Sequence, residues 1–175
     1  ALHNLDRHKS AIESAEYVIM EFGGNDCDHH WSEIADNPSA EHHPFISIPQ
    51  YSEQLHELIA SVQSLGAKPI LLSLPPIVAD KYFDTFTKDM SREQRDNVLL
   101  WLNGCLENIT QWHDMYNLAL FKLASDAGVE VIDITTPCLV KRDYRTLFCN
   151  DGIHPNALGH KLIAETICNS TNIWN

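Results

Sequence analysis

The chain has 175 residues, of which 44% are hydrophobic and 21% charged, as in globular proteins rather than disordered or fibrous ones. That length suits one domain with a sizeable core. Twelve Lys and Arg against 24 Asp and Glu give a net charge of −12, the wrong sign for binding a nucleic acid backbone or an anionic membrane. The apolar runs are much shorter than a membrane span, so we expect a soluble protein.

Three short apolar runs, each followed by polar or turn-forming residues, predict buried parallel strands. They occupy residues 17–22, 69–74 and 129–134. Between the first two, hydrophobic residues repeat with a helical period over residues 52–65. Ser52 is the expected N-cap of this helix.

The segment after the second strand, residues 77–90, has no clear period and is expected to be a long irregular excursion. A Ser and a Gln with the spacing of a capping box begin a predicted helix over residues 91–101. Further helices are predicted over about residues 106–127 and 156–168. Strands that alternate with helices predict an α/β fold with a parallel sheet, in a single domain covering residues 1–175.

The five cysteines are spread along the chain without C-x-x-C spacing, which predicts neither a disulfide framework nor a zinc ribbon. No secretory signal leads the sequence, so we expect a cytoplasmic location. The sequence starts without an initiator Met, and we expect the natural N-terminus to be missing. No feature of the sequence specifies an oligomeric state.

In an open parallel sheet, ligands bind outside the carboxyl ends of the strands. The first strand leads into a Gly-Gly-Asn-Asp turn, residues 23–26, which brings backbone and the amide of Asn25 to the end of that strand. The third is followed, after a loop, by Asp-Gly-Ile-His-Pro at residues 151–155. Asp151 lies three residues before His154 and can bind its Nδ1–H, which leaves Nε2 as a general base.

Either motif alone is weak evidence, because D-x-x-H also occurs at Asp26 and His29. With the following proline required, the two motifs are expected together by chance about one time in a thousand. They resemble, in residues, order and separation, two blocks of the SGNH hydrolase family, also called the GDSL family. The resemblance covers nearly the whole chain. It implies a flavodoxin-like three-layer α/β/α fold and a serine ester hydrolase, such as an esterase, lipase, acylhydrolase or O-acetylesterase, with no cofactor.

Carried over position by position, the resemblance makes Asn25 a donor of the oxyanion hole, His154 the general base and Asp151 the acid that orients it. Together with a serine, the last two would form a catalytic triad. The partner that the resemblance implies is a small-molecule ester. Gly24, in the turn, and Trp31, in the loop that follows, are the predicted substrate-binding residues.

The family's G-D-S block, which carries its nucleophilic Ser, does not occur in these 175 residues. Three predicted strands are also too few for a doubly wound sheet of this size. We therefore expect the nucleophile, a second oxyanion donor and the first strand or strands upstream of Ala1. The alternative is a natural chain that lacks the nucleophile and binds a ligand without turnover. Ser73 lies inside the second strand, where a serine is usually a packing residue, and is not expected to replace it.

The histidines near the Asn motif suggest a second alternative, a zinc site. His29, His30, His42 and His43 lie near Cys27, and imidazole and thiolate are ligands that suit zinc. Adjacent histidines tend to point apart, however, and no H-x-x-x-H pair is present. A surface loop is the favoured interpretation, and no metal is expected.

The loop over residues 28–49 is expected to line the substrate cleft. Trp31 and Phe45 either form an apolar wall of that cleft or are ordinary packing residues, and the sequence favours neither alternative. Aromatic residues of the later excursion either cap the same cleft or form a local hydrophobic cluster. These residues are Tyr82, Phe83 and Phe86.

Overall fold

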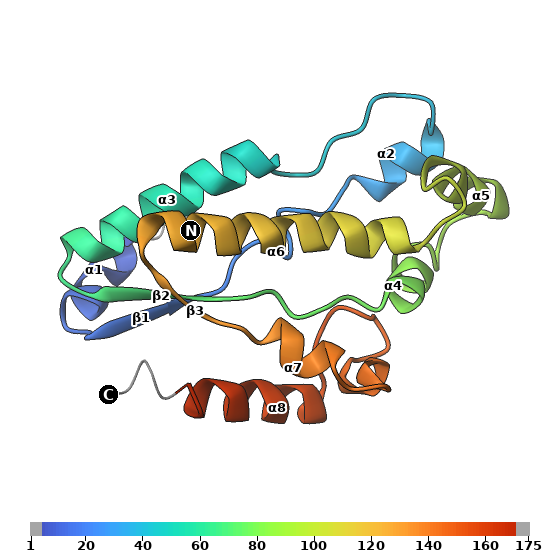
Figure 1. The fold of residues 1–175 in the computed structure, drawn as a ribbon. Helices are drawn as coiled ribbons and strands as arrows, with labels where there is room; N and C mark the ends of the chain where they lie inside the picture. The colour runs from blue at the N-terminus through green and yellow to red at the C-terminus, as the bar shows by residue number, and fades with distance from the viewer. Residues whose placement is uncertain (1–4, 171–175) are drawn as a thin grey trace.

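The computed structural model describes residues 5–170, which are built on a parallel sheet (Figure 1). Strands β1 (Tyr17–Met20), β2 (Lys68–Leu72) and β3 (Glu130–Ile132) lie in that order. Ile70, at the centre of β2, is paired on both sides. The three predicted strands and their parallel direction are confirmed. Each ends two residues before its predicted end, because the chain leaves the sheet there to form loops.

Helices cover both faces of the sheet and make a three-layer α/β/α arrangement, as expected (Figure 1). Helices α3 (Ile48–Ser64) and α6 (Glu107–Ala127) lie on one face, and α8 (Ala157–Cys168) lies on the other. Side chains alternate between the faces of a strand. Leu71 of β2 therefore packs in the core with α3 and α6, while Ile70 packs toward α8.

Helix α3 begins earlier than the sequence pattern predicts. Its N-cap is Ser47, whose hydroxyl accepts a hydrogen bond of 3.4 Å from the N–H of Gln50. Pro49 occupies the first turn, where its missing N–H costs nothing. The predicted N-cap, Ser52, lies inside the helix, so that prediction is wrong. The periodic hydrophobic residues mark the buried stripe of the helix but not its first turn.

Other helix ends agree with the predictions. Helix α5 (Arg92–Trp101) begins with a capping box, in which the Ser91 hydroxyl accepts from the N–H of Gln94 at 3.2 Å and the Gln94 side chain accepts from the N–H of Ser91 at 3.0 Å. Helix α6 ends at Gly128, which has a left-handed φ of 64°. Asn156 caps α8 by accepting two backbone N–H groups of its first turn at 2.9 and 3.2 Å.

The sequence patterns did not predict the shorter helices. These are α1 (Leu5–Glu13), α2 (Trp31–Asp36), α4 (Ala79–Phe86), α7 (Thr135–Leu139) and a 3₁₀ turn at Tyr144–Leu147. Helices α2 and α4 lie in segments predicted as a loop and an irregular excursion. Both are short, and both are held by contacts with distant segments, which a local period does not reveal.

Helices α2, α4 and α5 gather beyond the carboxyl ends of the strands (Figure 1). They share a buried cluster that includes Trp31, Ile34, Phe83, Val98 and Leu102. The cluster forms a wall at the edge of the sheet where ligands are expected to bind. No helix within residues 5–170 has the length and apolar character needed to cross a bilayer.

Candidate active site

The turn after β1 positions Asn25. Gly23 has a φ of 129°, and a Cβ there would lie 3.1 Å from the hydroxyl oxygen of Tyr51. That hydroxyl donates a hydrogen bond of 2.9 Å to the carbonyl of Phe22, and the N–H of Cys27 donates to the carbonyl of Gly23 at 3.1 Å. The side-chain amide of Asn25 is exposed and makes no hydrogen bond within residues 5–170. Its N–H groups are therefore free to bind a ligand.

One carboxylate organises the loop before α8. Oδ1 of Asp151 accepts from the backbone N–H groups of Ile153 and His154, each at 3.0 Å, and Oδ2 lies 3.0 Å from Nδ1 of His154. An ionised carboxylate only accepts, so Nδ1 carries the proton and donates it. Nε2 is then left as an acceptor. The His154 side chain is 73% exposed, so this nitrogen is open to a ligand.

The same contacts set the charge of Asp151. Partial burial by itself raises the pKa of its carboxyl, but the hydrogen bonds from the backbone N–H groups of His154 and Ile153 and from the imidazole outweigh that effect. The net pKa lies below its usual value, so Asp151 is ionised at neutral pH. An ionised neighbour stabilises the imidazolium that forms when His154 takes up a proton.

The loop is anchored to the excursion through Gly152. Its carbonyl accepts from the N–H of Val78 at 2.8 Å, and its φ is 79°. A Cβ at this position would lie 2.6 Å from the carbonyl oxygen of Val78 and 2.7 Å from the backbone nitrogen of Tyr82. Both distances are shorter than real Cβ contacts, and both neighbours are backbone atoms. A glycine is therefore required beside the Asp151 and His154 pair.

We expect Gly152→Ala to lower the free energy of unfolding by about 3 kcal/mol or more, from the left-handed φ and the overpacking together. Gly128→Ala is the matched control, because Gly128 has a φ of 64° but no atom within 4 Å of an added Cβ. The control should lose only about 1 kcal/mol. Urea denaturation of the two variants measures the difference. Equal losses would contradict the close packing at Gly152.

A cavity of about 450 Å³ lies between the two loops. Its walls come from residues 21–29, from Pro75 and Ile77 after β2, from Tyr82 of α4, from the first two turns of α6 and from residues 153–155. These segments are far apart in the sequence and meet at the carboxyl ends of the strands. The position agrees with the general rule for open parallel sheets.

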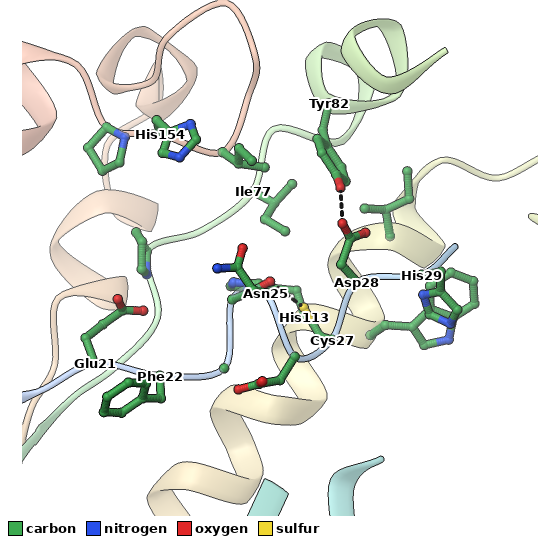
Figure 2. A pocket seen from close by; sticks show the side chains of 18 of the residues that line it. Glu21, Phe22, Asn25, Cys27, Asp28, His29, Ile77, Tyr82, His113 and His154 are labelled. Carbon is green, nitrogen blue, oxygen red and sulfur yellow. Dashed lines mark hydrogen bonds between the residues drawn. The ribbon is translucent and has the colours of Figure 1, made fainter. Parts of the chain in front are cut away.

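The structure brings the predicted site residues together at this cavity. Gly24, Asn25, Trp31 and His154 line it, and Asp151 contacts His154 from behind. Figure 2 shows Asn25 near the centre of the view and His154 on the loop across from it. An imidazole nitrogen and an amide donor therefore face one space that a small ligand could enter.

A second carboxylate holds α4 against the loop that follows Asn25. Oδ1 of Asp28 accepts from the indole N–H of Trp31 at 2.7 Å. Oδ2 accepts from the hydroxyl of Tyr82 at 2.7 Å (Figure 2). Trp31 also stacks on Phe86, with ring centroids 4.2 Å apart and planes 11° apart. The excursion is thus a fixed wall of the cavity.

The aromatic residues of the excursion and of the loop over residues 28–49 do not all line the cavity. Of the three in the excursion, Tyr82 lines the cavity, while Phe83 and Phe86 belong to the hydrophobic cluster behind it. Of the two alternatives for Phe45, the structure agrees with packing outside the cavity. Phe45 is 45% exposed and packs on His30, outside the cavity. The backbone N–H of Phe45 donates to the carbonyl of Asp28 at 2.8 Å, beside the cavity, but its ring packs on His30 instead of lining the cavity.

Three carboxyl side chains give the cavity an acidic lining. Glu21, Asp26 and Asp28 all line it. Loss of surrounding water raises the pKa of Glu21, an effect that His113 partly offsets, and burial raises the pKa of Asp26. Burial thus disfavours the ionised form of a carboxyl at this cavity. The cavity suits an uncharged ligand better than an anionic one.

Ser73 has a structural role. Its side chain is fully buried, and its hydroxyl accepts from the N–H groups of Ile134 at 2.8 Å and Thr135 at 3.0 Å. The same hydroxyl lies 3.2 Å from the carboxylate of Asp133, to which it donates. It joins the ends of β2 and β3. Within residues 5–170, no serine lines the cavity.

The histidines near the Asn motif point in different directions. Nε2 of His42 lies 2.8 Å from the carbonyl oxygen of Asn37, and His43 lies 3.4 Å from Glu41. His29 packs among tryptophan rings. In the described part of the chain, no three His, Cys, Asp or Glu side chains come together as metal ligands. The structure therefore offers no support for the zinc alternative.

Two ionisable residues at the cavity, Glu21 and His113, could not be identified from the sequence. Glu21 falls in the predicted strand, and His113 lies on α6 next to the inward-facing Trp112. His113 is buried, and its Nδ1 has no hydrogen-bond partner within the described residues. A helical period marks the inward face of α6 but does not separate positions that line a cavity from positions that fill the core.

Solved structures share this fold at low sequence identity. The α/β hydrolase LAE5 from the metagenome of Lake Arreo, Spain, has a TM-score of 0.62 and 19% identity, over 99% of this chain and 67% of that one. A catalytic mutant of Axe2, an acetylxylan esterase from Geobacillus stearothermophilus, has a TM-score of 0.61 and 16% identity, over 95% of this chain and 65% of that one. The neighbours confirm the flavodoxin-like fold of SGNH hydrolases.

Two curated proteins are similar in sequence. The GDSL esterase/lipase CPRD49 of Arabidopsis thaliana is 27% identical over 161 residues, which cover 91% of this chain and 55% of the relative. The isoamyl acetate-hydrolyzing esterase 1 homolog of Mus musculus is 24% identical over 173 residues, which cover 95% of this chain and 60% of the relative. The chain thus spans little more than half of each relative. The model of the GDSL-like lipase/acylhydrolase family matches residues 2–162, and the chain therefore belongs to that family.

Proposed function

We propose that this chain forms most of a serine ester hydrolase, whose nucleophile is a serine on a segment N-terminal to residue 1. The observation that carries the proposal is the placement of Asn25 and His154 on one cavity, with Asp151 bound to Nδ1 of His154. A base, an acid that orients it and an amide donor are the groups that this reaction needs besides the nucleophile.

In the proposed reaction, the serine Oγ attacks the carbonyl carbon of the ester while its proton passes to Nε2 of His154. Hydrogen bonds from the amide of Asn25 and from backbone N–H groups stabilise the charge that develops on the carbonyl oxygen. Collapse of the tetrahedral intermediate breaks the ester C–O bond, and Nε2 gives its proton to the leaving alcohol. A water molecule, deprotonated by the same nitrogen, then hydrolyses the acyl-serine. The reaction uses no cofactor.

The open edge of β1 supports this assignment. Within the described residues, β1 pairs with β2 on one side and with no strand on the other. Near that edge, Ile19 is 41% exposed and Phe22 is 39% exposed. A parallel strand added there would cover both residues and end beside Asn25. We propose that the missing N-terminal part of the domain, with the serine, occupies this edge, and that residues 1–175 are the rest of one domain.

The acidic lining of the cavity supports an uncharged ester as the substrate. Two similar proteins are named for acetate esters, the isoamyl acetate-hydrolyzing esterase 1 homolog and the acetylxylan esterase Axe2. We therefore propose short acyl esters, acetates included, as the substrate class. All five cysteines are unpaired, which fits the cytoplasm as the proposed location.

A non-catalytic binding module on the same fold is the second candidate. The observation that favours it is the cavity lining, which contains no serine within residues 5–170. A binding module and an enzyme differ in whether an ester is consumed.

Hydrolysis of p-nitrophenyl acetate by the natural protein that contains this sequence separates the two candidates. We expect turnover that depends on His154. A protein that binds the ester without releasing p-nitrophenol would be a binding module, and turnover that survives the loss of His154 would contradict the assigned base.

A further inference from the structure

His29 is a buried polar residue that the proposed reaction does not use. Its side chain lies among three indole rings, with centroid distances of 5.6 Å to Trp31, 5.1 Å to Trp101 and 4.9 Å to Trp112. The residue is only 6% exposed, yet it lines the cavity. Its Nδ1 has no hydrogen-bond partner among residues 5–170. A buried polar group without a partner is costly, so the residue calls for an explanation.

The imidazole is uncharged in this environment. Burial lowers the pKa of His29 to about 4. The neighbouring histidines act in the same direction, and Asp28 has a smaller effect in the opposite direction. A neutral imidazole has one nitrogen that donates and one that accepts. It is therefore suited to a hydroxyl group, which can donate and accept in the same way.

The surroundings of His29 limit the rest of the ligand. The walls next to it are apolar or aromatic, and include Trp31, Ile109 and Trp112. The nearest carboxylate, Asp28, already accepts hydrogen bonds at both oxygens, from Trp31 and Tyr82. A sugar ring would bring several hydroxyls that lack partners here, at a cost for each. An aromatic ring with a single hydroxyl needs one partner and can pack edge-to-face on the indoles.

We propose that this end of the cavity is a subsite for an aromatic ring that bears one hydroxyl group, which hydrogen-bonds to the imidazole of His29. The inference rests on the proposed function, since it names the group that an ester would place there. The subsite makes the cavity selective for esters that carry a hydroxyphenyl ring over esters that carry an unsubstituted phenyl ring. The other unpartnered imidazole, His113, does not offer the same site, because the carboxylate of Asp114 lies 3.9 Å from its Nδ1.

The test compares two neutral amides that an esterase does not consume readily, N-[2-(4-hydroxyphenyl)ethyl]acetamide and N-(2-phenylethyl)acetamide, which keep a short acyl group and carry the ring on the other side of the amide. Their dissociation constants are measured by calorimetry with the natural protein. We expect the phenol to bind about tenfold more tightly, as one buried hydrogen bond provides. Equal affinities would overturn the subsite without any variant.

Two variants locate the effect. His29→Phe keeps a planar ring but removes both nitrogens, so we expect the two amides to bind equally to it. Because this variant also removes an unpaired buried group, its thermal midpoint should not fall. His30→Phe, at the exposed neighbouring position, is the matched control and should keep the tenfold difference. A preference for the phenol that persists in His29→Phe would overturn the role of His29.

The same protein preparations are assayed with p-nitrophenyl acetate, which has no hydroxyl to reach the subsite. Turnover that depends on His154, combined with equal binding of the two amides, would overturn the subsite and leave the proposed hydrolase intact. Selective binding of the phenol without any ester turnover would support the subsite and contradict the proposed hydrolase activity.

Discussion

Replacement of His154 by alanine is expected to lower kcat for p-nitrophenyl acetate by about 10⁴-fold or more, with little change in KM. The reason is chemical. Nε2 of His154 must take the proton of the nucleophile and return it to the leaving alcohol. Among residues 5–170, no other imidazole on the cavity is within hydrogen-bond distance of a carboxylate. The side chain is largely exposed, so its loss should leave the fold unchanged.

The control for this variant is His160→Ala. His160 is an exposed histidine on α8, six residues further along the chain, and it does not line the cavity. Its replacement should leave kcat within about twofold of the wild type. A His154→Ala protein that keeps a tenth or more of the wild-type kcat would show that another group acts as the base.

Replacement of Asn25 by alanine is expected to lower kcat by about 10²–10³-fold, the usual cost of losing one oxyanion donor. KM should change little, because the hydrogen bond to the carbonyl oxygen strengthens as charge develops in the transition state. The amide of Asn25 is exposed and makes no hydrogen bond within residues 5–170, so its removal breaks no hydrogen bond among those residues. Thermal denaturation should give the same midpoint as the wild type.

Two further substitutions sharpen this prediction. Asn25→Asp keeps the shape of the side chain but replaces the N–H donor with a carboxylate, so it should be at least as inactive as Asn25→Ala. Asn37→Ala removes an exposed amide at the end of α2, away from the cavity, and should retain wild-type kcat. An active Asn25→Asp protein would exclude Asn25 as an oxyanion donor.

The parts of the fold that could be predicted from the sequence are those that local patterns determine. The three strands are continuous apolar runs, and the capping box at Ser91 and the glycine at position 128 mark helix ends through contacts within a few residues. Helix α4 could not be predicted. Its side chains are arranged around Trp31, which lies about 50 residues earlier, and no local period reflects that contact.

The candidate site divides in the same way. The contact between Asp151 and His154 joins residues three apart, and the turn at Asn25 needs only its neighbouring glycines, so both follow from short motifs. The bond between Asp28 and Tyr82 joins residues 54 apart, and the enclosure of His29 depends on rings of α5 and α6. Those contacts form only when segments far apart in the sequence pack together, so short motifs do not predict them. They determine the shape of the cavity.

In the proposed enzyme, a serine outside these 175 residues passes its proton to His154 and attacks the ester. Labelling of the natural protein with a fluorophosphonate ester, followed by peptide mapping, tests this step most directly, because the reagent forms a stable bond with an activated serine. We expect a single label on a serine N-terminal to residue 1, and its loss in the His154→Ala protein. A label within residues 1–175, or labelling that does not depend on His154, would contradict this step.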